Sequence, residues 1–255
     1  MNVLGVILAR AGSVGLPSKH LLTLLGKPVI SYTIEHARAS WLLNRVVVST
    51  DCPDVKSIAQ SEKMEVIDRP AALATSEASV QDVMLHALRT VETKKPALKI
   101  DALVVLYGNV PVRRASVIDE ALEMLAETGC DSVRSFCPVG KWHPAWMSTF
   151  DGERVVPLQP GSIHRRQDLT PLFLHDGAVV AISRASLLRG VDHPEDPHAF
   201  FGEDRRGIHT EATDTVEIDH LRDLYWAEAV LRERGGGPRV AHPRTRPGHQ
   251  RRLAS

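Results

Sequence analysis

A glycine-containing loop with two cations follows the first apolar run of the chain. The run spans Val3 to Leu8, and the next stretch reads ARAGSVGLPSKH. Glycines let backbone N–H groups approach phosphate oxygens closely. Arg10 and Lys19 could neutralise the charge that builds on a leaving pyrophosphate. The stretch therefore indicates a phosphate-binding loop, although a plain strand-to-helix turn with surface cations would have the same composition.

Two common phosphate loops do not fit this stretch. The P-loop needs Gly-Lys-Ser/Thr five residues after its first glycine, and from Gly12 that position falls on Pro17. The dinucleotide fingerprint G-x-G-x-x-G needs a glycine where this chain has Arg10. What remains is R-x-G-S-x-G-x-x-x-K, in which Ser13 adds a hydroxyl.

Short apolar runs alternate with amphipathic segments over much of the chain. Helical spacing is found in Pro28–Ala39, Glu77–Glu92 and Ala115–Glu127. This alternation predicts an α/β fold with a mostly parallel sheet covered on both faces. Ligands bind at the carboxyl ends of such strands, where the glycine loop lies. The expected strands are Val3–Leu8, Arg45–Thr50, Met64–Ile67, Ala102–Leu106, Ser132–Phe136 and Ala178–Ile182.

The alternation of strand and helix patterns stops between residues 138 and 175, a segment that we call the excursion. It has several prolines and no long helical period, and it predicts short antiparallel strands. It also holds Trp142, Trp146 and Phe150 in a chain with few aromatic residues. These rings would either fill a local core or form a dimer contact, because aromatic residues are enriched at interfaces.

Composition excludes several classes of protein. The 255 residues have a formal net charge of zero, which gives no electrostatic case for binding nucleic acid or an anionic membrane. No apolar stretch reaches the roughly 18 residues of a membrane span, and the N-terminus lacks a secretory signal. Three widely spaced cysteines form no C-x-x-C pair, which favours reduced thiols and a cytoplasmic location.

The chain divides into a body, residues 1–234, and a basic tail, residues 235–255. The tail has five arginines, no acidic residue and frequent Gly and Pro, so it is predicted to be disordered. It would be a simple extension, an arm that touches an acidic partner, or a segment that lies against its own body.

The sequence resembles the acylneuraminate cytidylyltransferase family, which activates sialic acid and related keto sugars with CTP. The similarity runs in order from about residue 3 to residue 233. It is carried by VILARAGSVGLPSKH, GKPVISYTIEHARAS, RVVVSTDCPDVKSIAQ, DRPAALATSEASV, RRQDLTPLFLHDGAVVAIS and TVEIDHLRDLYWAEAVL.

The resemblance implies a Rossmann-like three-layer α/β/α nucleotidyltransferase fold and a homodimer built through the excursion. It implies that a sugar hydroxyl attacks the α-phosphorus of CTP and that pyrophosphate leaves. Such chemistry rests on positioning and charge neutralisation. Mg²⁺ is the implied cofactor, since it prefers oxygen ligands and substrate phosphates.

The resemblance also assigns site residues to this chain. Arg10 and Lys19 match catalytic positions of the triphosphate loop. Tyr107, Lys141, Arg166 and Gln167 lie in segments that face the sugar or the dimer partner. The expected nucleotide-binding residues are Ala9, Arg10, Gly12, Ser13, Lys19, His20, Arg69, Ser79 and Asn109.

Glu217 and Asp219 match the acidic pair that holds metal in this family, and Asp219 also counts as catalytic. Residues i and i+2 of an extended segment point to the same side, so the two carboxylates could share one cation. The alternative for Asp219 is a helix N-cap before Leu221.

The chain departs from the family pattern at several of these positions. His20 stands where the family usually has asparagine, Glu217 replaces the commoner aspartate, and Asp176 replaces an asparagine before Gly177. In LYGNVPVR, Tyr107 replaces a glutamine and Asn109 replaces threonine or aspartate. Tyr107 therefore leaves the identity of the sugar open.

We expect a CTP-dependent enzyme that activates a keto-deoxy sugar acid, a sialic acid-like nonulosonate or an octulosonate. Two alternatives remain. The chain could transfer another base or use another sugar, or it could be a degenerate relative that binds nucleotide or a protein without turnover.

Overall fold

The computed structural model describes residues 1–12, 15–159, 161 and 163–235. The predicted tail, apart from Gly235, and Ser13 lie outside these residues. Within them, a seven-stranded sheet has the order β11-β7-β10-β6-β1-β4-β5. Its strands are β1 (Val3–Leu8), β4 (Arg45–Thr50), β5 (Glu65–Asp68), β6 (Ala102–Tyr107), β7 (Ser132–Pro138), β10 (Phe173–Ser183) and β11 (Arg205–His209).

Strand direction follows the prediction of a mostly parallel sheet. β1 pairs in parallel with β4 and β6, β4 with β5, and β7 with β11. Only β10 runs antiparallel to its neighbours in this sheet, β6 and β7. Because the parallel strands end at the same edge, the loops after β1, β4 and β6 meet there.

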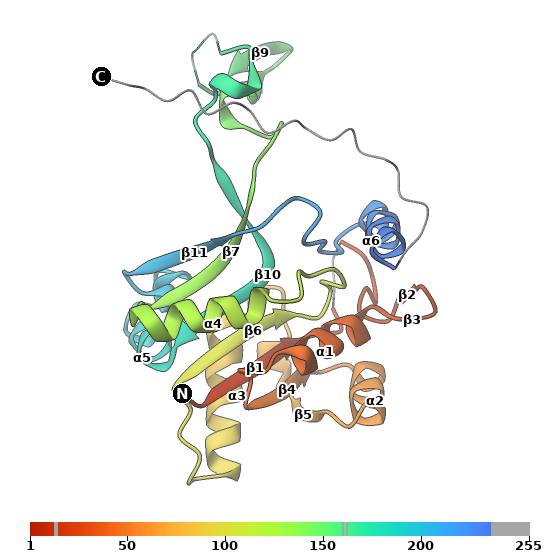
Figure 1. Cartoon of the computed structure of the whole chain (residues 1–255), viewed down its shortest axis with the longest axis vertical. Helices are drawn as coiled ribbons and strands as arrows, with labels where there is room; N and C mark the ends of the chain where they lie inside the picture. Colours follow the sequence, from red (N-terminus) through yellow and green to blue (C-terminus); the bar gives the residue numbers. More distant parts are fainter. Residues whose placement is uncertain (13–14, 160, 162, 236–255) are drawn as a thin grey trace, which may run out of the picture.

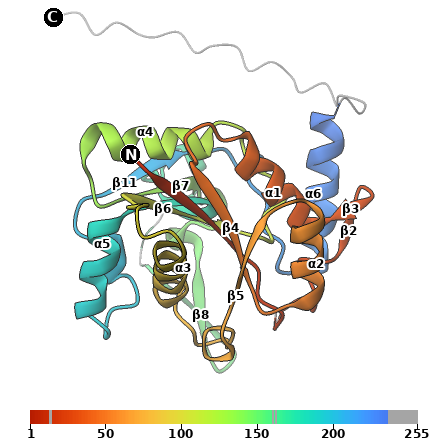
Figure 2. The ribbon, with the colours of Figure 1, turned by 90° about the horizontal axis from the view of Figure 1, so that it is seen from below.

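Helices cover both faces of the sheet (Figures 1 and 2). On one face lie α1 (Val29–Ala39), α2 (Pro53–Ser61) and α4 (Val117–Thr128), and on the other lie α3 (Val80–Lys94) and α5 (Arg184–Arg189). Helix α6 (Leu221–Arg234) packs with Tyr32 and Val112 in a smaller cluster at the side.

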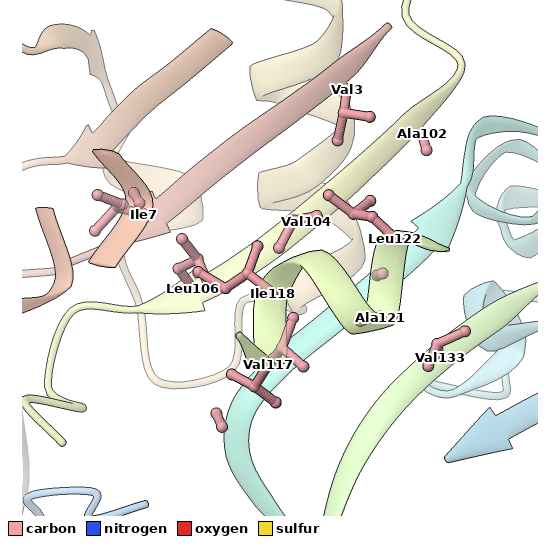
Figure 3. Packing of buried hydrophobic residues seen from close by; sticks show 14 of the residues in the cluster. Val3, Ile7, Ala102, Val104, Leu106, Val117, Ile118, Ala121, Leu122 and Val133 are labelled. Carbon is pink, nitrogen blue, oxygen red and sulfur yellow. The ribbon is translucent and has the colours of Figure 1, made fainter. Parts of the chain in front are cut away.

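Alternation along the strands explains the two buried layers. In β1, Val3 and Ile7 join the cluster under α1 and α4, while Leu4 and Val6 join the cluster under α3. Figure 3 shows the first cluster, in which Leu122 of α4 faces the sheet. Such burial on both faces accounts for the unbroken apolar runs in the sequence.

Several predicted boundaries were wrong by a few residues. Pro28 is the residue before α1 and not its first helical residue. Helix α3 begins at Val80 and not at Glu77, because the Ser79 side chain caps it by accepting from the N–H of Asp82 at 3.0 Å. Strand β10 starts at Phe173, five residues before the predicted start at Ala178.

The excursion forms an arm outside the body. The outer halves of β7 and β10 pair and lead to a small antiparallel hairpin of β8 (Ser148–Asp151) and β9 (Arg154–Pro157) (Figure 1). Short antiparallel strands are thereby confirmed. Trp142 and Phe150 are 68% and 75% exposed, so the prediction that they fill a local core was wrong.

The remaining short elements of the described part of the chain are the β2–β3 hairpin (Thr23–Leu24 and Lys27–Pro28) and five 3-10 turns. The turns are η1 (Ala71–Leu73), η2 (Pro144–Trp146), η3 (Arg166–Asp168), η4 (Gly190–Asp192) and η5 (Ala199–Phe201). Among the described residues, no helix is both long and apolar enough to cross a membrane. The three cysteines are free thiols.

Candidate active site

The glycine loop leaves β1 at the carboxyl edge of the sheet and is anchored on both sides. The Thr50 hydroxyl donates to the buried carbonyl of Ala9 at 2.6 Å, and the N–H of Ala11 donates to Asp51 Oδ1 at 2.9 Å. The Arg10 guanidinium donates to the carbonyl of Thr75 in the loop before α3. Gly12 is exposed and has open space around its Cα.

The end of the same loop places a cation beside a buried neutral imidazole. Lys19 Nζ lies 2.7 Å from Asp219 Oδ1. His20 is only 5% exposed, and burial, reinforced by the charge of Lys19, lowers its pKa to about 4. A Cβ on Gly108 would lie 3.1 Å from His20 Nδ1, so glycine is needed where the loop after β6 passes this imidazole ring.

The segment Val216–Asp219, which we call the acidic segment, is held in place by the loop that follows β6. The N–H of Ile218 donates to the carbonyl of Asn109 at 2.8 Å, and Val216 forms a bridge with Val112. The Asn109 amide donates to Glu217 Oε1 at 3.1 Å and to the Ile218 carbonyl at 3.0 Å. The same amide lies 3.5 Å from Asp219 Oδ1, so Asn109 contacts both acidic side chains.

Asp219 is not the N-cap of α6, so that alternative was wrong. His220 occupies the N-cap and forms a capping box with Asp223. Asp223 also accepts the N–H of Asp219 at 3.0 Å, which leaves the Asp219 carboxylate to Lys19. A Cβ on Gly15 would lie 2.9 Å from the Asp219 carbonyl oxygen, so the glycine loop passes directly against this segment.

Tyr107 ends β6 next to the acidic pair. Burial, with a further contribution from the charge of Glu217, raises its pKa to about 12, so its phenol is neutral and can donate. The fully buried Arg113 donates to the carbonyls of Tyr107, Val110 and Ala178, at 2.7–2.8 Å. Sequence reasoning missed this role of Arg113, which fixes the turn after β6.

Arg69 and Ser79 line the same cavity as Arg10 and Lys19. The buried Arg69 donates to the Ser49 hydroxyl at 3.2 Å and to the Ser49 carbonyl at 2.8 Å. Burial lowers its pKa to about 10, so it remains a cation at neutral pH. Ser79 both caps α3 and faces the cavity.

A cavity of about 250 Å³ brings most of these residues together. The predicted site residues among its lining are Arg10, Lys19, His20, Arg69, Ser79, Tyr107, Asn109 and Glu217. Sequence reasoning missed the wall from the loop before α3, whose small residues gave no chemical signal. That loop contributes Thr75, Ser76 and Ala78, while Leu73 of η1 and Val80 and Val83 of α3 add apolar lining.

Three predicted substrate residues do not line this cavity. Lys141, Arg166 and Gln167 belong to the excursion, where Lys141 Nζ lies 4.9 Å from the centroid of the Trp142 ring. Within one chain, these three residues therefore lie apart from the rest of the predicted site.

The acidic pair has the chemistry of a magnesium site that is completed by substrate. Burial, and then the charge of Asp219, raises the pKa of Glu217. A cation between the two carboxylates would therefore offset their mutual repulsion. Among the described residues, no group of three or more His, Cys, Asp or Glu could hold a metal alone. Mg²⁺ is often held by one or two carboxylates plus substrate phosphates, which this pair fits.

Arginine and lysine side chains that face the same cavity as Glu217, at the carboxyl ends of parallel strands, define a nucleotide-handling protein of the α/β class. Residues 4–194 match the model of a family described as cytidylyltransferase, and the chain belongs to that family. The matched segment ends before Glu217 and Asp219.

Named relatives agree with the resemblance read from the sequence. The N-acylneuraminate cytidylyltransferase of Streptococcus agalactiae serotype V is 33% identical over 193 residues, which cover 74% of this chain and 45% of that protein. The CMP-N,N'-diacetyllegionaminic acid synthase of Legionella pneumophila is 32% identical over 200 residues, covering 77% and 84%. The chain spans about half the length of the N-acylneuraminate cytidylyltransferase from Streptococcus.

A solved structure confirms the predicted fold. It is described as CMP:2-keto-3-deoxy-manno-octonic acid synthetase complexed with CTP. The match has a TM-score of 0.69 at 22% identity and covers 92% of this chain and 100% of that one. The three-layer α/β/α nucleotidyltransferase fold is therefore established.

Proposed function

We propose that this protein transfers CMP from CTP to a keto-deoxy sugar acid and releases pyrophosphate. The observation that carries the proposal is the placement of Arg10 and Lys19 around the same cavity as Glu217, with Asp219 joined to Lys19. Cations are needed where the leaving pyrophosphate gathers charge, and carboxylates are needed where a metal would meet the phosphates. Both requirements are met within one site.

The chain's own residues would divide the work. Arg10 and Lys19 bind the triphosphate and stabilise the leaving group, while Arg69 and Ser79 lie where the nucleoside would be held. Asn109 keeps Glu217 and Asp219 in position to hold Mg²⁺, which when bound would neutralise phosphate charge. The sugar hydroxyl forms the new P–O bond as the bond to pyrophosphate breaks.

The relatives' names support a sugar acid as acceptor. One acts as an N-acylneuraminate cytidylyltransferase and another as a synthase of CMP-N,N'-diacetyllegionaminic acid. Tyr107 replaces the amide expected in this family, so we expect a preference other than for the commonest N-acetylated sialic acid. A site that changes one polar partner changes which hydroxyl pattern it accepts.

We also propose a homodimer, formed through the excursion. Trp142, Phe150 and Leu174 are 68%, 75% and 63% exposed there, which is unusual for a contiguous arm of a lone protomer. In a dimer Lys141, Arg166 and Gln167 would face the partner's cavity. Sedimentation of the native protein and of the Phe150→Asp variant tests the dimer. We expect the native protein to sediment as a dimer and the variant as a monomer. A native protein that sediments as a monomer at micromolar concentration contradicts it. The cytoplasmic location remains a prediction.

Pyrophosphate release, measured with four nucleoside triphosphates against a panel of keto-deoxy sugar acids, tests the function. We expect release only when CTP, Mg²⁺ and a sugar acid are all present. Release with another nucleotide or a neutral sugar would make the protein a different nucleotidyltransferase. Binding of CTP without turnover on any acid would make it a non-catalytic relative.

A further inference from the structure

Arg134 lies in the middle of β7 and projects from the same face of the sheet as Tyr107. It pairs with Val180 of β10, which pairs with Val105 of β6. Val180 and Val105 belong to the buried cluster under α3, and Tyr107 packs against that cluster. Since paired residues project to the same face, Arg134 lies on the face of the sheet that carries Tyr107, two strands away from it and outside the residues that line the cavity.

Two aromatic rings hold the Arg134 guanidinium. Its central carbon lies 4.3 Å from the centroid of the Phe201 ring and 5.1 Å from that of Phe136. Stacking of this kind fixes the planar group and compensates in part for lost hydration. The side chain is half-buried and thus held in one place without being sealed from a ligand.

Among the described residues, the Arg134 side chain has neither an acidic partner nor a hydrogen bond, whereas Arg205, which also lacks a carboxylate, donates to the carbonyls of Gly202 and His198. Arg189 pairs with Asp131, Arg206 pairs with Asp204, and both are salt bridges at the rim of β11 and α5. The charged or titratable groups that act on Arg134 are Arg205 and the Tyr107 phenol, and no described carboxylate is among them. A half-buried guanidinium without an anion is a site where a ligand anion gains charge-assisted hydrogen bonds.

We propose that Arg134, together with the Tyr107 hydroxyl, binds the carboxylate of the sugar acid; this rests on the proposed function. In the ring form of a 2-keto sugar acid the reacting C2 hydroxyl and the carboxylate are attached to the same carbon. The acceptor's carboxylate must therefore lie close to the reacting centre at Glu217. A Cβ on Gly177 would lie 3.1 Å from Glu217 Oε2 and 3.8 Å from Tyr107 Cδ2, so Tyr107 borders that centre.

The test compares Arg134→Met with Arg205→Met. Methionine keeps the apolar stem against the rings but removes the charge. Arg205 is a matched control, because it lies 6.0 Å from the same Phe201 ring and its Nε donates to a backbone carbonyl, that of Gly202. We expect Arg134→Met to raise KM for the sugar acid about 10- to 100-fold, as for a lost hydrogen bond to a charged group. KM for CTP should stay unchanged in both variants.

A binding measurement separates this inference from the proposed function. Calorimetry follows the sugar acid and its uncharged C1 amide binding to each variant, with an unreactive CTP analogue present. Native protein should prefer the acid, Arg134→Met should bind acid and amide alike, and Arg134→Lys should recover part of the preference. An unchanged preference in folded Arg134→Met, or an equal loss in Arg205→Met, overturns the inference alone. Native protein that binds no sugar acid overturns the proposed function as well.

Discussion

Lys19 Nζ donates to Asp219 Oδ1 at 2.7 Å, although 200 positions separate the two residues. The lysine side chain is 15% exposed and the aspartate side chain is 54% exposed. The ammonium is therefore shielded while the carboxylate keeps an open side. This contact joins the phosphate loop to the acidic segment, and an open carboxylate next to a fixed cation suits electrostatic stabilisation of charge on the substrate phosphates.

Asp219→Asn should lower kcat by roughly 10²–10³-fold, the range for losing one preorganised electrostatic contact, with a smaller effect on CTP affinity. Pyrophosphate release and calorimetric titration of CTP measure the two effects. The matched variant is Asp223→Ala, which removes the acceptor for the N–H groups of Asp219 and His220. This variant should lower Tm, and it should lower kcat less than Asp219→Asn does. Full activity of a folded Asp219→Asn protein would remove this residue from the site.

Arg10→Ala should slow pyrophosphate formation by about 10²–10³-fold without unfolding the protein, because its side chain reaches the cavity and not the core. Lys56→Ala provides the control. Lys56 pairs with Asp68 on the same side of the sheet but does not line this cavity. A loss of less than tenfold for Arg10→Ala would return the glycine loop to a plain connection.

Gly177→Ala should reduce both stability and kcat, whereas Gly129→Ala should reduce stability alone. Both glycines have positive φ, +77° and +65°, so each alanine costs about 1–2 kcal/mol of backbone strain. A Cβ on Gly177 would press on Glu217 Oε2, while one on Gly129 meets open space. We expect at least a tenfold lower kcat for Gly177→Ala, since small misplacements in a site are costly.

Urea unfolding and steady-state assays of the two glycine variants measure these effects side by side. If Gly129→Ala lost as much activity as Gly177→Ala, the loss would reflect backbone strain in general. The contact between residue 177 and Glu217 would then have no special importance.

His20 should make the protein less stable as the pH falls from about 6.5 toward about 4. Its pKa is 6.5 ordinarily and about 4 in the fold, because burial opposes the charged form. Between these values the unfolded chain takes up a proton that the folded chain does not. The free energy of unfolding therefore falls with decreasing pH, by at most about 1.4 kcal/mol per pH unit for this group.

His20→Asn should flatten that dependence, since asparagine does not titrate. Urea unfolding of both proteins at pH 7, 6 and 5 measures the slopes. His36, whose pKa burial lowers to about 3, remains in both and provides a common background. Equal slopes would mean that His20 takes up its proton without cost in the folded protein.

Periodicity predicted the central strands well, because strands buried on both faces leave continuous apolar runs. Val3–Leu8 and Arg45–Thr50 agree with the structure residue for residue. The start of β10 was missed because its outer half, in the arm, is exposed and carries His175 and Asp176. Helix α2 was not predicted as an element, since only Val55 and Ala59 of its nine residues are buried.

Family resemblance, and not spacing, identified most of the site. Spacing left Asp219 as a helix cap, and only the tertiary fold shows that His220 caps α6 and frees Asp219 for Lys19. Arg113 and Arg134 could not be predicted, because their roles depend on which strands lie side by side. No local pattern reveals that an arginine of β7 and a tyrosine of β6 share one face of the sheet, with a third strand between them.

The docking of Val216–Asp219 onto Asn109 and Gly15 bears on when the protein becomes competent during its synthesis. A ribosome makes the phosphate loop first, and Asp219 follows Lys19 only after 200 positions. An emerging chain therefore has Arg10 and Lys19 long before any carboxylate can join them. Under the proposed function, a chain made only as far as residue 215 lacks both carboxylates and cannot turn nucleotide over, and emergence of Glu217 and Asp219 completes the site.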